Sequence, residues 1–527
     1  MQNINAVEIY DSTLRDGAQS RGISFSVSDK LKILSRLDEF GVDYIEAGNP
    51  GSNPKDLHFF EKAKLVRLKN SALVAFGSTK RKLIAPCDDD NLNAILKANT
   101  KYATIFGKSW DLHVFDILDT TLLENLKMIE QSIEYLIDKG KTVFFDAEHF
   151  FDGYKNNRDY SLDSLKVAHK AGAEKIILCD TNGGFLPHEI FEIVADVKRE
   201  LSDERLTIGI HAHNDSGCAV ANSIEAVRAG ARQIQGTFIG IGERTGNANL
   251  STLIPNLEAK TAYKTLAGKN MGALTDTAHY IAEVANLALS SRMPYVGTAA
   301  FSHKGGMHVD GVLKNPVSFE HIEPCVVGNE RNVLLSEVAG RGAVIAKIMK
   351  IGQLSGLEKS SPIVNDIIAK IKKMEHKGFH FEAAAASFEL LVLKMLGKIK
   401  PFFVIENFEI ISSLNDSNLS TATVTVRVDD VCEMVTLDGT GPVNAIDRAL
   451  RAALEKLYPV LCGVRLSDYK VRVVDEGNST ASTTRVLIES TNGKETWTTV
   501  GASKDIINAS IQALSDSLEY ILIRRPT

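Results

Sequence analysis

Short apolar runs recur through the first half of the chain and predict a series of buried strands. Each run is rich in β-branched or aromatic residues and leads, through a turn, into a stretch with helical periodicity. Eight runs have this pattern: Val7–Thr13, Tyr44–Gly48, Ala72–Ser78, Tyr102–Gly107, Val143–Phe150, Lys175–Thr181, Ile208–Asn214 and Gln233–Gly240. Near-continuous apolarity is typical of parallel strands that are covered on both faces. Eight strand–helix units in about 250 residues therefore predict an α/β fold, the (β/α)8 or TIM barrel, rather than an open sheet.

After about residue 270 the strand pattern fades, and helical periodicity continues as far as residue 400. The stretches DTAHYIAEVANLAL and FEAAAASFELLVLKMLG are apolar at helical spacing, and the loop-rich segment Pro294–Pro324 lies between them. Residues 271–400 are therefore predicted to form a helical linker region that extends a barrel domain of residues 1–270.

Alternating polarity returns in residues 401–527 and predicts a separate α+β domain. The alternation is clear in Ala422–Val428, Tyr469–Asp475 and Thr484–Ser490. Two helical stretches, GPVNAIDRALRAAL from Gly441 and GASKDIINASIQAL from Gly501, align with each other at an offset of 60 residues. This echo predicts two copies of a unit of strands followed by a helix, which bury their apolar faces against each other or against a partner chain.

Composition limits the kinds of partner. The chain has 527 residues, of which 24% are charged, and a formal net charge of −6. Its length predicts two or three domains. Because the chain is mildly acidic and has no block of like charge, it lacks the basic surface of a phosphate-backbone binder, and we expect no nucleic acid partner.

Nothing in the sequence predicts a membrane span or a secretory signal. Apolar runs are shorter than the roughly 18 to 20 residues that cross a bilayer, and the start MQNINAVEIYDS has neither a basic nor an apolar signal region. The six cysteines are far apart and include no CxxC pair, which argues against disulfides and zinc ribbons. We expect a cytoplasmic protein with reduced cysteines and no membrane partner.

The stretch HAHND, at the end of the seventh predicted strand, is a candidate metal site. Alternate residues of a strand project to the same side, so His211 and His213 can direct ring nitrogens at one ion. Asp11 or Asp16, near the end of the first strand, can reach the same point, because only one strand separates the two in a closed barrel. Such ligands suit a divalent ion: zinc, manganese, cobalt or, less well, magnesium. The alternative is a pair of surface or core histidines without a ligand.

Two further stretches lie near this point in the predicted barrel. In GERTGNANL, after the eighth strand, Asn247 or Glu243 can add an oxygen ligand. In LRDGAQ, Arg15 offers a planar, permanently charged group beside Asp16, suited to an enolate or a carboxylate. The alternative for Arg15 is an ion pair with Asp16 that only fixes the loop.

Two other strand ends carry candidate catalytic and binding residues. Glu148, in DAEHFFDG, lies among phenylalanines that would partly remove it from water, which favours a general base; the alternative is a carboxylate in a salt bridge at the barrel rim. Thr181, in CDTNGG, precedes paired glycines, where its hydroxyl can hold a substrate carboxylate.

The loop SHKGGMHVDG, Ser302–Gly311, is a candidate flexible flap. It holds two histidines and an aspartate between glycines, and it can bring a proton donor such as His308 over the barrel mouth. The alternative for each histidine is an ordinary exposed or core position.

Together these stretches resemble one family, the metal-dependent acyl-CoA condensing enzymes and lyases that comprise isopropylmalate, homocitrate and citramalate synthases and hydroxymethylglutaryl-CoA lyase. LRDGAQ, HAHND and GERTGNANL are similar to its three signature stretches and occur in the same order. The paired units after Pro401 resemble the allosteric dimerisation domain of the synthases, which the lyases lack. VDYIEAGNPGSNPKD and AFSHKGGMHVDGVLKNP, among others, are similar to the longer citramalate synthases. The resemblance covers nearly the whole chain.

The resemblance implies a role for individual residues. It implies a metal site made by Asp16, His211, His213 and Asn247. It implies that Arg15 stabilises the enolate, that Glu148 deprotonates the acetyl group, and that His308 acts from the flap of a partner subunit. The substrate-binding residues that it implies are Arg15, Gln19, Thr181 and Asp310.

Two positions depart from the family pattern. Asn49 stands where similar sequences usually have Trp, which leaves the choice of keto acid open. Phe319 stands where a Tyr is usual, which removes a hydroxyl that would be available to catalysis.

The implied reaction joins acetyl-CoA to pyruvate, with a divalent metal ion as cofactor, isoleucine as effector and a homodimer as the assembly. A sibling synthase that uses another 2-oxo acid, to form 2-isopropylmalate or homocitrate, is one alternative, and a lyase of the same barrel is another. From a different class, the chain could be a catalytically inactive barrel that serves as an amino-acid-sensing binding protein.

Overall fold

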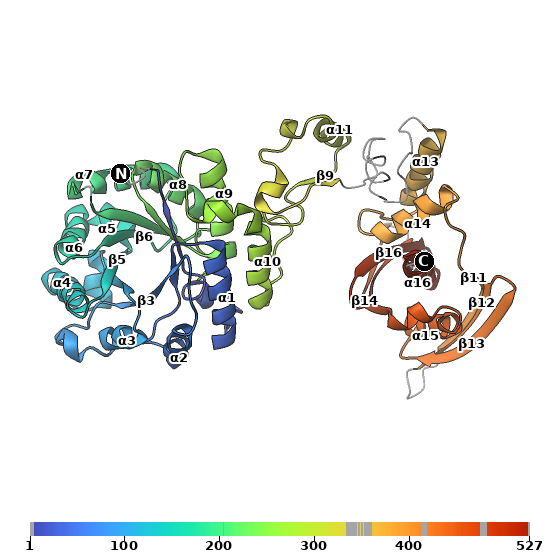
Figure 1. Cartoon of the computed structure of the whole chain (residues 1–527), viewed down its shortest axis with the longest axis horizontal. Coiled ribbons are helices and arrows are strands. Elements are labelled where there is room, and N and C mark those ends of the chain that lie inside the picture. The colour runs from blue at the N-terminus through green and yellow to red at the C-terminus, as the bar shows by residue number, and fades with distance from the viewer. Residues whose placement is uncertain are drawn as a thin grey trace. The chain divides into compact units, whose positions relative to one another are not determined.

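The computed structural model describes the chain apart from residues 1–4, 204, 334–344, 346–347, 349–350, 352–360, 413–418, 475–481 and 525–527. The chain divides into two compact units. The first comprises Met1–Phe301 and His321–Arg331, and the second comprises Ser302–Glu320 and Asn332–Thr527. Figure 1 shows a barrel in the first unit and antiparallel sheets with helices in the second.

Eight parallel strands close into a barrel in the first unit, in the order β1 to β8, which confirms the predicted TIM barrel. The strands are β1 (Glu8–Asp11), β2 (Tyr44–Glu46), β3 (Ala72–Ser78), β4 (Tyr102–Lys108), β5 (Thr142–Glu148), β6 (Lys175–Asp180), β7 (Thr207–Ala212) and β8 (Gln233–Gly236). Each predicted run overlaps one of them. Pairing of β1 with β8, from Glu8 with Gln233 to Asp11 with Gly236, closes the barrel.

Helices surround the strands in Figure 1. They are α1 (Val27–Phe40), α2 (Pro54–Ala63), α3 (Asp90–Ala98), α4 (Leu122–Asp138), α5 (Phe150–Asn156), α6 (Arg158–Lys170), α7 (Pro187–Leu201), α8 (Ala219–Ala229), α9 (Leu250–Lys260) and α10 (Leu274–Val284). Helix α1 shows how local sequence sets these bounds. The side chains of Ser26 and Asp29 cap its first turn reciprocally, and Gly41 ends it in the left-handed conformation, with φ at 94°.

Side chains fill the barrel interior. Tyr10, Tyr44, Val74, Tyr102 and Phe144, one from each of β1 to β5, form a cluster of their own, in which the rings of Tyr44 and Phe144 lie 5.2 Å apart. A larger cluster joins apolar residues of the strands to those of the surrounding helices. Because the interior is a packed core, polar chemistry is confined to the ends of the strands.

Six of the eight predicted runs extend beyond the strands that they contain, and two of these lead directly into helical structure. β5 ends at Glu148, and α5 begins at Phe150 after His149 has turned the chain with φ at 54°. β8 ends at Gly236, and Phe238–Gly240 form a 3-10 turn. Phe150 is nevertheless fully buried, so apolar residues beyond a strand end need not belong to the sheet.

Two three-stranded antiparallel sheets, each followed by a helix, form the C-terminal part of the second unit, as the sequence echo predicts. The first copy comprises β11 (Val404–Ser412), β12 (Ser420–Val428), β13 (Val431–Gly439) and α15 (Pro442–Glu455). The second comprises β14 (Arg465–Val473), β15 (Thr484–Thr491), β16 (Thr496–Ser503) and α16 (Ile506–Ile523). Both copies contribute apolar side chains to one core cluster, so they bury their apolar faces against each other.

At the offset of 60 residues, buried positions of the two helices correspond, but the glycines before the helices do not. Ala449 and Ala509 are both fully buried. Gly441, however, is the N-cap of α15, whereas Gly501 lies within β16. Ile506 is 42% exposed because α16 begins only at this residue.

Residues of the predicted linker, 271–400, divide between the two units. α10 belongs to the first unit. β9 (Ser302–His303), α11 (Gly306–Lys314), β10 (Asn332–Val333), α13 (Pro362–His376) and α14 (Ala385–Met395) belong to the second. The side chain of Ser387 joins α14 to the second sheet–helix copy, because its hydroxyl donates to Asp516 at 2.6 Å and accepts from the backbone N–H of Val500 at 3.0 Å. The domain boundaries at residues 270 and 400 stay predictions.

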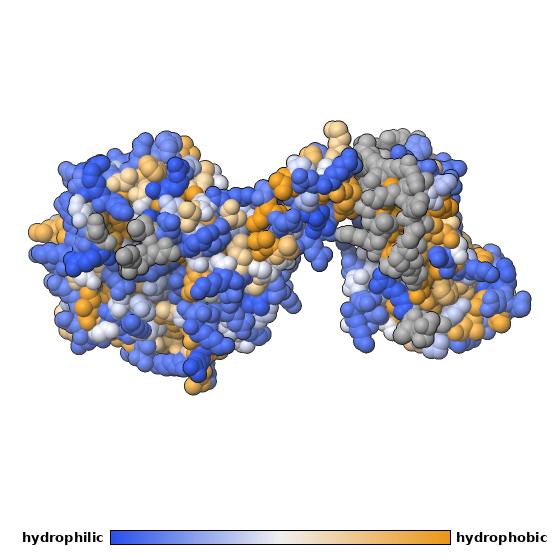
Figure 2. All heavy atoms as spheres, turned by 45° about the horizontal axis from the view of Figure 1, so that its top comes forward, coloured by the Kyte–Doolittle hydropathy of each residue, from blue (hydrophilic) through white to orange (hydrophobic). Residues whose placement is uncertain are grey.

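Hydrophilic side chains cover most of the visible face of each unit, with hydrophobic ones in smaller patches (Figure 2). Within the described part of the chain, no helix has the length and apolar character of a membrane span. All six cysteines are free, as expected.

Gly501 approaches α16 so closely that no side chain fits. A Cβ there would overlap the carbonyl oxygen of Ala509, which belongs to the helix backbone. Gly501→Ala should therefore lower the free energy of unfolding of the second unit by about 1–3 kcal/mol. Gly463→Ala is the control, because no atom lies within 4 Å of the added methyl. Urea unfolding followed by the fluorescence of Trp497, in a Trp110→Phe background, measures both, and equal midpoints would contradict the expectation.

Candidate functional site

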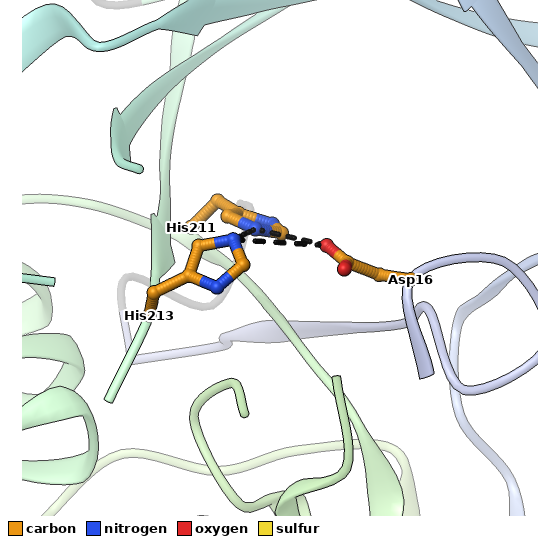
Figure 3. A group of neighbouring side chains, drawn as sticks. All are labelled: Asp16, His211 and His213. Carbon is orange, nitrogen blue, oxygen red and sulfur yellow. Dashed lines mark hydrogen bonds and ion pairs between the residues drawn. The ribbon is translucent and has the colours of Figure 1, made fainter. Parts of the chain in front are cut away.

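Three side chains meet at the carboxyl ends of β1 and β7. Asp16 lies in the turn after β1, His211 in β7, and His213 directly after β7. The Nε2 atoms of His211 and His213 lie 3.3 Å and 3.9 Å from Asp16 Oδ2, and 3.3 Å from each other. Both rings and the carboxylate are directed at one point (Figure 3). The three residues are buried and their ligand atoms lie within 4.8 Å of one another, so they can hold a metal ion.

Asn247 lies beside this cluster. Its backbone forms an antiparallel bridge with His213, and the residue is 2% exposed. Its side-chain nitrogen donates to the carbonyl of Ile241 at 3.4 Å, whereas its Oδ1 is buried and has no hydrogen-bond partner among the described residues. A buried acceptor without a partner is costly, and a cation would satisfy it. The chemistry of these four residues therefore fits a divalent ion.

Asp11, the other carboxylate candidate, has a different role. Its two oxygens accept from the backbone N–H and the hydroxyl of Thr13, each at 2.9 Å. These bonds close the turn that precedes Asp16. Among the described residues, the ligand cluster therefore contains Asp16 and not Asp11. Glu243, the alternative to Asn247, lines the adjoining cavity with its side chain half exposed.

Gln235 of β8 orients the imidazole of His211. Its Oε1 lies 2.9 Å from Nδ1 of His211, and its Nε2 donates to Asp146 at 3.1 Å. Because an amide oxygen can only accept, Nδ1 of His211 carries a proton. Nε2 is then the nitrogen that remains to bind an ion, and it is the one that faces Asp16.

Charges within the cluster shift the pKa values of its members. Burial opposes the ionised form of Asp16, but Arg15 and the histidines outweigh it and hold the pKa of Asp16 well below its usual range. Burial, together with the nearby His211, lowers the pKa of His213 to about 3, so that ring is neutral at pH 7. Burial also opposes a charge on His211, but Asp16 raises the pKa of His211 above its ordinary value. An ion bound at Nε2 of His211 would displace the proton that this nitrogen carries in the charged form.

Arg15 is held between two carboxylates. Its Nε donates to Glu46, and its Nη1 lies 3.3 Å from Asp16. Glu46 is fully buried on β2 and also accepts from the hydroxyls of Tyr10 and Ser12, each at 2.7 Å. Burial opposes the charge on Arg15, but these carboxylates raise its pKa above the ordinary value. The predicted alternative, a pair with Asp16, is thus present as well.

A cavity of about 200 Å³, here called the reaction cavity, opens beside the cluster. Its lining includes eight residues that the sequence singled out: Arg15, Asp16, Gln19, Glu148, Thr181, His211, His213 and Glu243. Four more residues line it: Phe76, Phe106, Asp146 and Cys179. The guanidinium of Arg15 lies over the ring of Phe76 at 3.8 Å, and Phe76 stacks on Phe106. A second cavity of about 330 Å³ shares Arg15, Gln19 and Phe76 and extends to Asn49.

The carboxylate of Glu148 and the hydroxyl of Thr181 both face the reaction cavity. The side chain of Glu148 is 23% exposed and forms an ion pair with Lys108 of β4, which is the alternative that the sequence left open. The hydroxyl oxygen of Thr181 accepts from the backbone N–H of His149 at 2.9 Å. Its own hydrogen donates to none of the residues that the structure describes and can bind a substrate oxygen.

His308 and Asp310 belong to the second unit, and their roles at the barrel stay predictions. The segment expected as a flexible flap forms helix α11, because Val309 and Val312 recur at helical spacing and are buried. The ring of His308 stacks on Phe319 with 4.3 Å between centroids. Asp310 pairs with Lys314 on the same helix at 2.6 Å.

Sequence reasoning missed the residues that support the site. Glu46, Gln235 and Lys108 were given no role. Arg244 was also missed, although it binds Asp215 at 2.8 Å and donates to the carbonyl of Thr181 at 2.6 Å. Each of these acts on a side chain far away in the sequence, so spacing does not reveal it. Their places near the carboxyl ends of strands are the signal that was available.

Comparison with known families agrees with this architecture. The model of the HMGL-like family matches residues 6–281, and that of the homocitrate synthase post-HMGL domain-like family matches residues 295–378. The model of the LeuA allosteric (dimerisation) domain matches residues 382–522. The chain is an enzyme of the barrel type and belongs to the HMGL-like family.

Individual relatives resemble the chain over its whole length. An (R)-citramalate synthase of Aquifex aeolicus is 50% identical over 521 residues, which cover 98% of each chain. An (R)-citramalate synthase of Synechocystis is 48% identical over 97% of this chain and 95% of the relative. A 2-isopropylmalate synthase of Pyrococcus furiosus is more distant, with 32% identity over 98% of this chain and 99% of the relative.

The contact between Gln235 and His211 should set metal affinity. Gln235→Leu frees the imidazole to rotate, and loss of such a supporting hydrogen bond typically weakens metal binding by about 10- to 100-fold. Titration calorimetry with Mn²⁺ or Co²⁺ measures the affinity, and His213→Ala should weaken it further. The matched control is Gln233→Leu, a buried residue of the same strand whose side chain donates to Glu8. Equal affinities for the two Leu variants would contradict the assigned role.

Proposed function

We propose that the chain condenses acetyl-CoA with pyruvate and water to give (R)-citramalate and CoA. The observation that carries this proposal is full-length similarity, at 43–50% identity, to five curated (R)-citramalate synthases. The reaction cavity supports it, because about 200 Å³ is less than the roughly 300–1,000 Å³ of pockets for drug-sized ligands and suits a three-carbon keto acid.

Four residues would hold a divalent ion: Asp16, His211, His213 and Asn247. Two imidazole ligands favour zinc, manganese or cobalt over magnesium. Bound there, the ion would supply Lewis-acid polarisation of the keto group.

The protein's own groups bind and orient the keto acid. The free hydroxyl hydrogen of Thr181 donates to its carboxylate, and Gln19 lies in the same lining. Arg15, fixed by Glu46, presents its charge to the keto oxygen.

Glu148 accepts a proton from the methyl carbon of acetyl-CoA, and His308 from the flap of a partner subunit is the proposed second acid–base residue. The enolate carbon attacks C2 of pyruvate, a carbon–carbon bond forms, and the keto oxygen becomes an alkoxide that takes up a proton. Arg15 stabilises the negative charge that develops on that oxygen. Water then cleaves the thioester and releases citramalate and CoA.

A synthase for a larger 2-oxo acid is the second candidate, because of Asn49. This residue lines the cavity of about 330 Å³ beside Arg15 and Gln19, and its Oδ1 accepts from the backbone N–H of Gly51 at 3.1 Å. An amide in place of an indole leaves room for a longer substrate side chain. The intact ligand cluster speaks against an inactive amino-acid sensor, and the LeuA domain match speaks against a lyase.

Among a panel of 2-oxo acids, pyruvate should give the highest kcat/KM for CoA release from acetyl-CoA. Glu148→Gln should lower kcat by about 10²–10⁴, the usual contribution of a general base. Glu243→Gln, another carboxylate of the reaction cavity, should change kcat less than about tenfold. Detection of the free thiol of CoA measures the rate for each 2-oxo acid and for both variants. Higher kcat/KM with 2-oxoisovalerate than with pyruvate would overturn the substrate assignment.

For the second unit we propose that isoleucine is the effector. A cavity of about 580 Å³ lies where α15 meets the start of β14. Asp447 and Arg451, which pair with each other at 2.8 Å, line it together with Arg465 and the aliphatic Val443 and Leu466. These groups match the ammonium, the carboxylate and the side chain of an aliphatic amino acid.

A homodimer is the proposed assembly. The match to the LeuA allosteric (dimerisation) domain supports it. So do the apolar side chains that the outer strands of both sheets expose: Val404, Ile411, Val431, Met434, Val471 and Val473. Val404, Ile411 and Met434 lie on the same face of the first sheet, because they pair with alternate residues of β12, and exposed apolar groups of this kind are typical of a protein interface.

Asp447→Asn should raise the isoleucine concentration for half-inhibition about tenfold, because it removes a charge-assisted hydrogen bond to the ammonium group. Without isoleucine, kcat and KM should stay within about twofold of the wild type. Asp468→Asn, which removes an acidic side chain from β14 outside this cavity, is the control. The measurement is CoA release at increasing isoleucine, and unchanged inhibition of Asp447→Asn would contradict the proposed site.

A further inference from the structure

Arg244 connects three loops of the barrel unit and has no part in the proposed mechanism. It lies in the turn after β8, and its side chain is 42% exposed. Its Nε and Nη2 donate to the two carboxylate oxygens of Asp215 at 2.8 Å and 3.0 Å, and Nη2 also donates to the carbonyl of Thr181 at 2.6 Å. Because Asp215 follows β7 and Thr181 follows β6, one guanidinium joins the carboxyl ends of three neighbouring strands.

The backbone around this contact is adapted to it. Arg244 has φ at 56°, in the left-handed region that residues with a side chain seldom occupy. A Cβ at Gly183 would lie 2.6 Å from Asp215 Oδ2, so the two loops can approach this closely because Gly183 has no side chain. The backbone N–H of Ser216 also donates to the carbonyl of Gly183, at 2.9 Å. Uncommon backbone conformations of this kind persist where the surrounding contacts require them.

Thr181 depends on Arg244 for the position of its backbone. Among the described residues, Arg244 is the only donor to the carbonyl of Thr181. The hydroxyl oxygen of Thr181 accepts from the backbone N–H of His149, which follows β5. Donors from two different loops therefore fix this residue. An ion pair as exposed as that of Arg244 adds little to stability, so its contacts are better explained by the placement of Thr181.

The metal ligand candidates are held by other contacts. The backbone N–H of His213 donates to the carbonyl of Asp180 at 3.1 Å, and the backbone of His213 forms a bridge with Asn247. The backbone N–H of Asn214 donates to the carbonyl of Gly246 at 2.9 Å. These backbone bonds keep His213 and Asn247 together without the guanidinium.

We propose that Arg244 is a positioning residue for the 2-oxo acid, because its bond to the carbonyl of Thr181 places the Thr181 hydroxyl against the substrate carboxylate. The described lining of the reaction cavity includes Thr181 but not Arg244, so Arg244 acts through Thr181 and not on the substrate. Asp215 holds the guanidinium in the orientation that reaches Thr181. This assignment rests on the proposed function, because it takes Thr181 as the contact for the carboxylate.

The kinetic test compares the two substrates. Arg244→Met should raise KM for pyruvate about 10- to 100-fold, because the hydroxyl is misplaced, and leave kcat and KM for acetyl-CoA unchanged. Asp215→Asn, which weakens the hold on the guanidinium, should raise KM for pyruvate by a smaller factor. The matched control is Arg228→Met, because Arg228 forms a similar pair with both carboxylate oxygens of Glu225 on α8. An unchanged KM for pyruvate, or equal rises in both KM values, would overturn the proposal.

A double variant distinguishes action through Thr181 from a direct contact with the substrate. Thr181→Val removes the hydroxyl, so Arg244→Met added to it should raise KM for pyruvate no further. Effects that multiply would overturn the proposal. Titration calorimetry with Mn²⁺ should give the same affinity for Arg244→Met as for the wild type, and a weaker affinity would assign Arg244 to the metal ligands instead.

A structural measurement needs no turnover. In protein isotope-labelled at its threonine methyl groups, the NMR signal of Thr181 is identified by its loss in Thr181→Val. This signal should shift in Arg244→Met, or in Asp215→Asn where Arg244→Met fails to fold, and stay in place in Arg228→Met. An unshifted signal would overturn the proposal. If no 2-oxo acid causes CoA release, the proposed function fails, whereas the methyl signal still decides whether Arg244 positions Thr181.

Discussion

The ion pair between Arg15 and Glu46 is the interaction on which the arrangement of the barrel mouth depends. Glu46 is a fully buried carboxylate, and without a cation it would be strongly unfavourable in its ionised form. Its hydrogen bonds from Tyr10, Ser12 and Arg15 satisfy it and fix the guanidinium. Arg15 in turn holds Asp16 ionised for the histidines. The place of the metal ligand is thus set from β2, a strand that contributes no ligand itself.

The fold was largely predictable because the strands of the barrel have a simple, recurring apolar pattern. Strands that are buried on both faces give apolar runs, and all eight runs fall on strands. Strand ends were less predictable, since Phe150 continues an apolar run but is the buried first residue of helix α5, after the chain has turned at His149. Likewise, the echo of the C-terminal units predicted the buried faces of α15 and α16, but not where each helix begins.

The candidate site was predictable where residues act through their own chemistry and unpredictable where they act through others. The alternation of His211 and His213 at the end of one strand indicates that they share a side. The position of Asp16 after another strand indicates that it can reach them. The choice between Asp11 and Asp16 needed the structure, because it depends on which carboxylate is engaged by Thr13. Gln235 and Glu46 carry no motif of their own, since their effect comes from contacts across the barrel.

The ligand set spans almost the full length of the barrel sequence. Asp16 follows the first strand, whereas the histidines end the seventh and Asn247 follows the eighth. During synthesis, Asp16 emerges long before the histidines, so the candidate ligands come together only when β7 and β8 have joined the barrel. An ion bound at this site would therefore report barrel closure. Its binding energy would stabilise the complete barrel over forms that lack part of the ligand set.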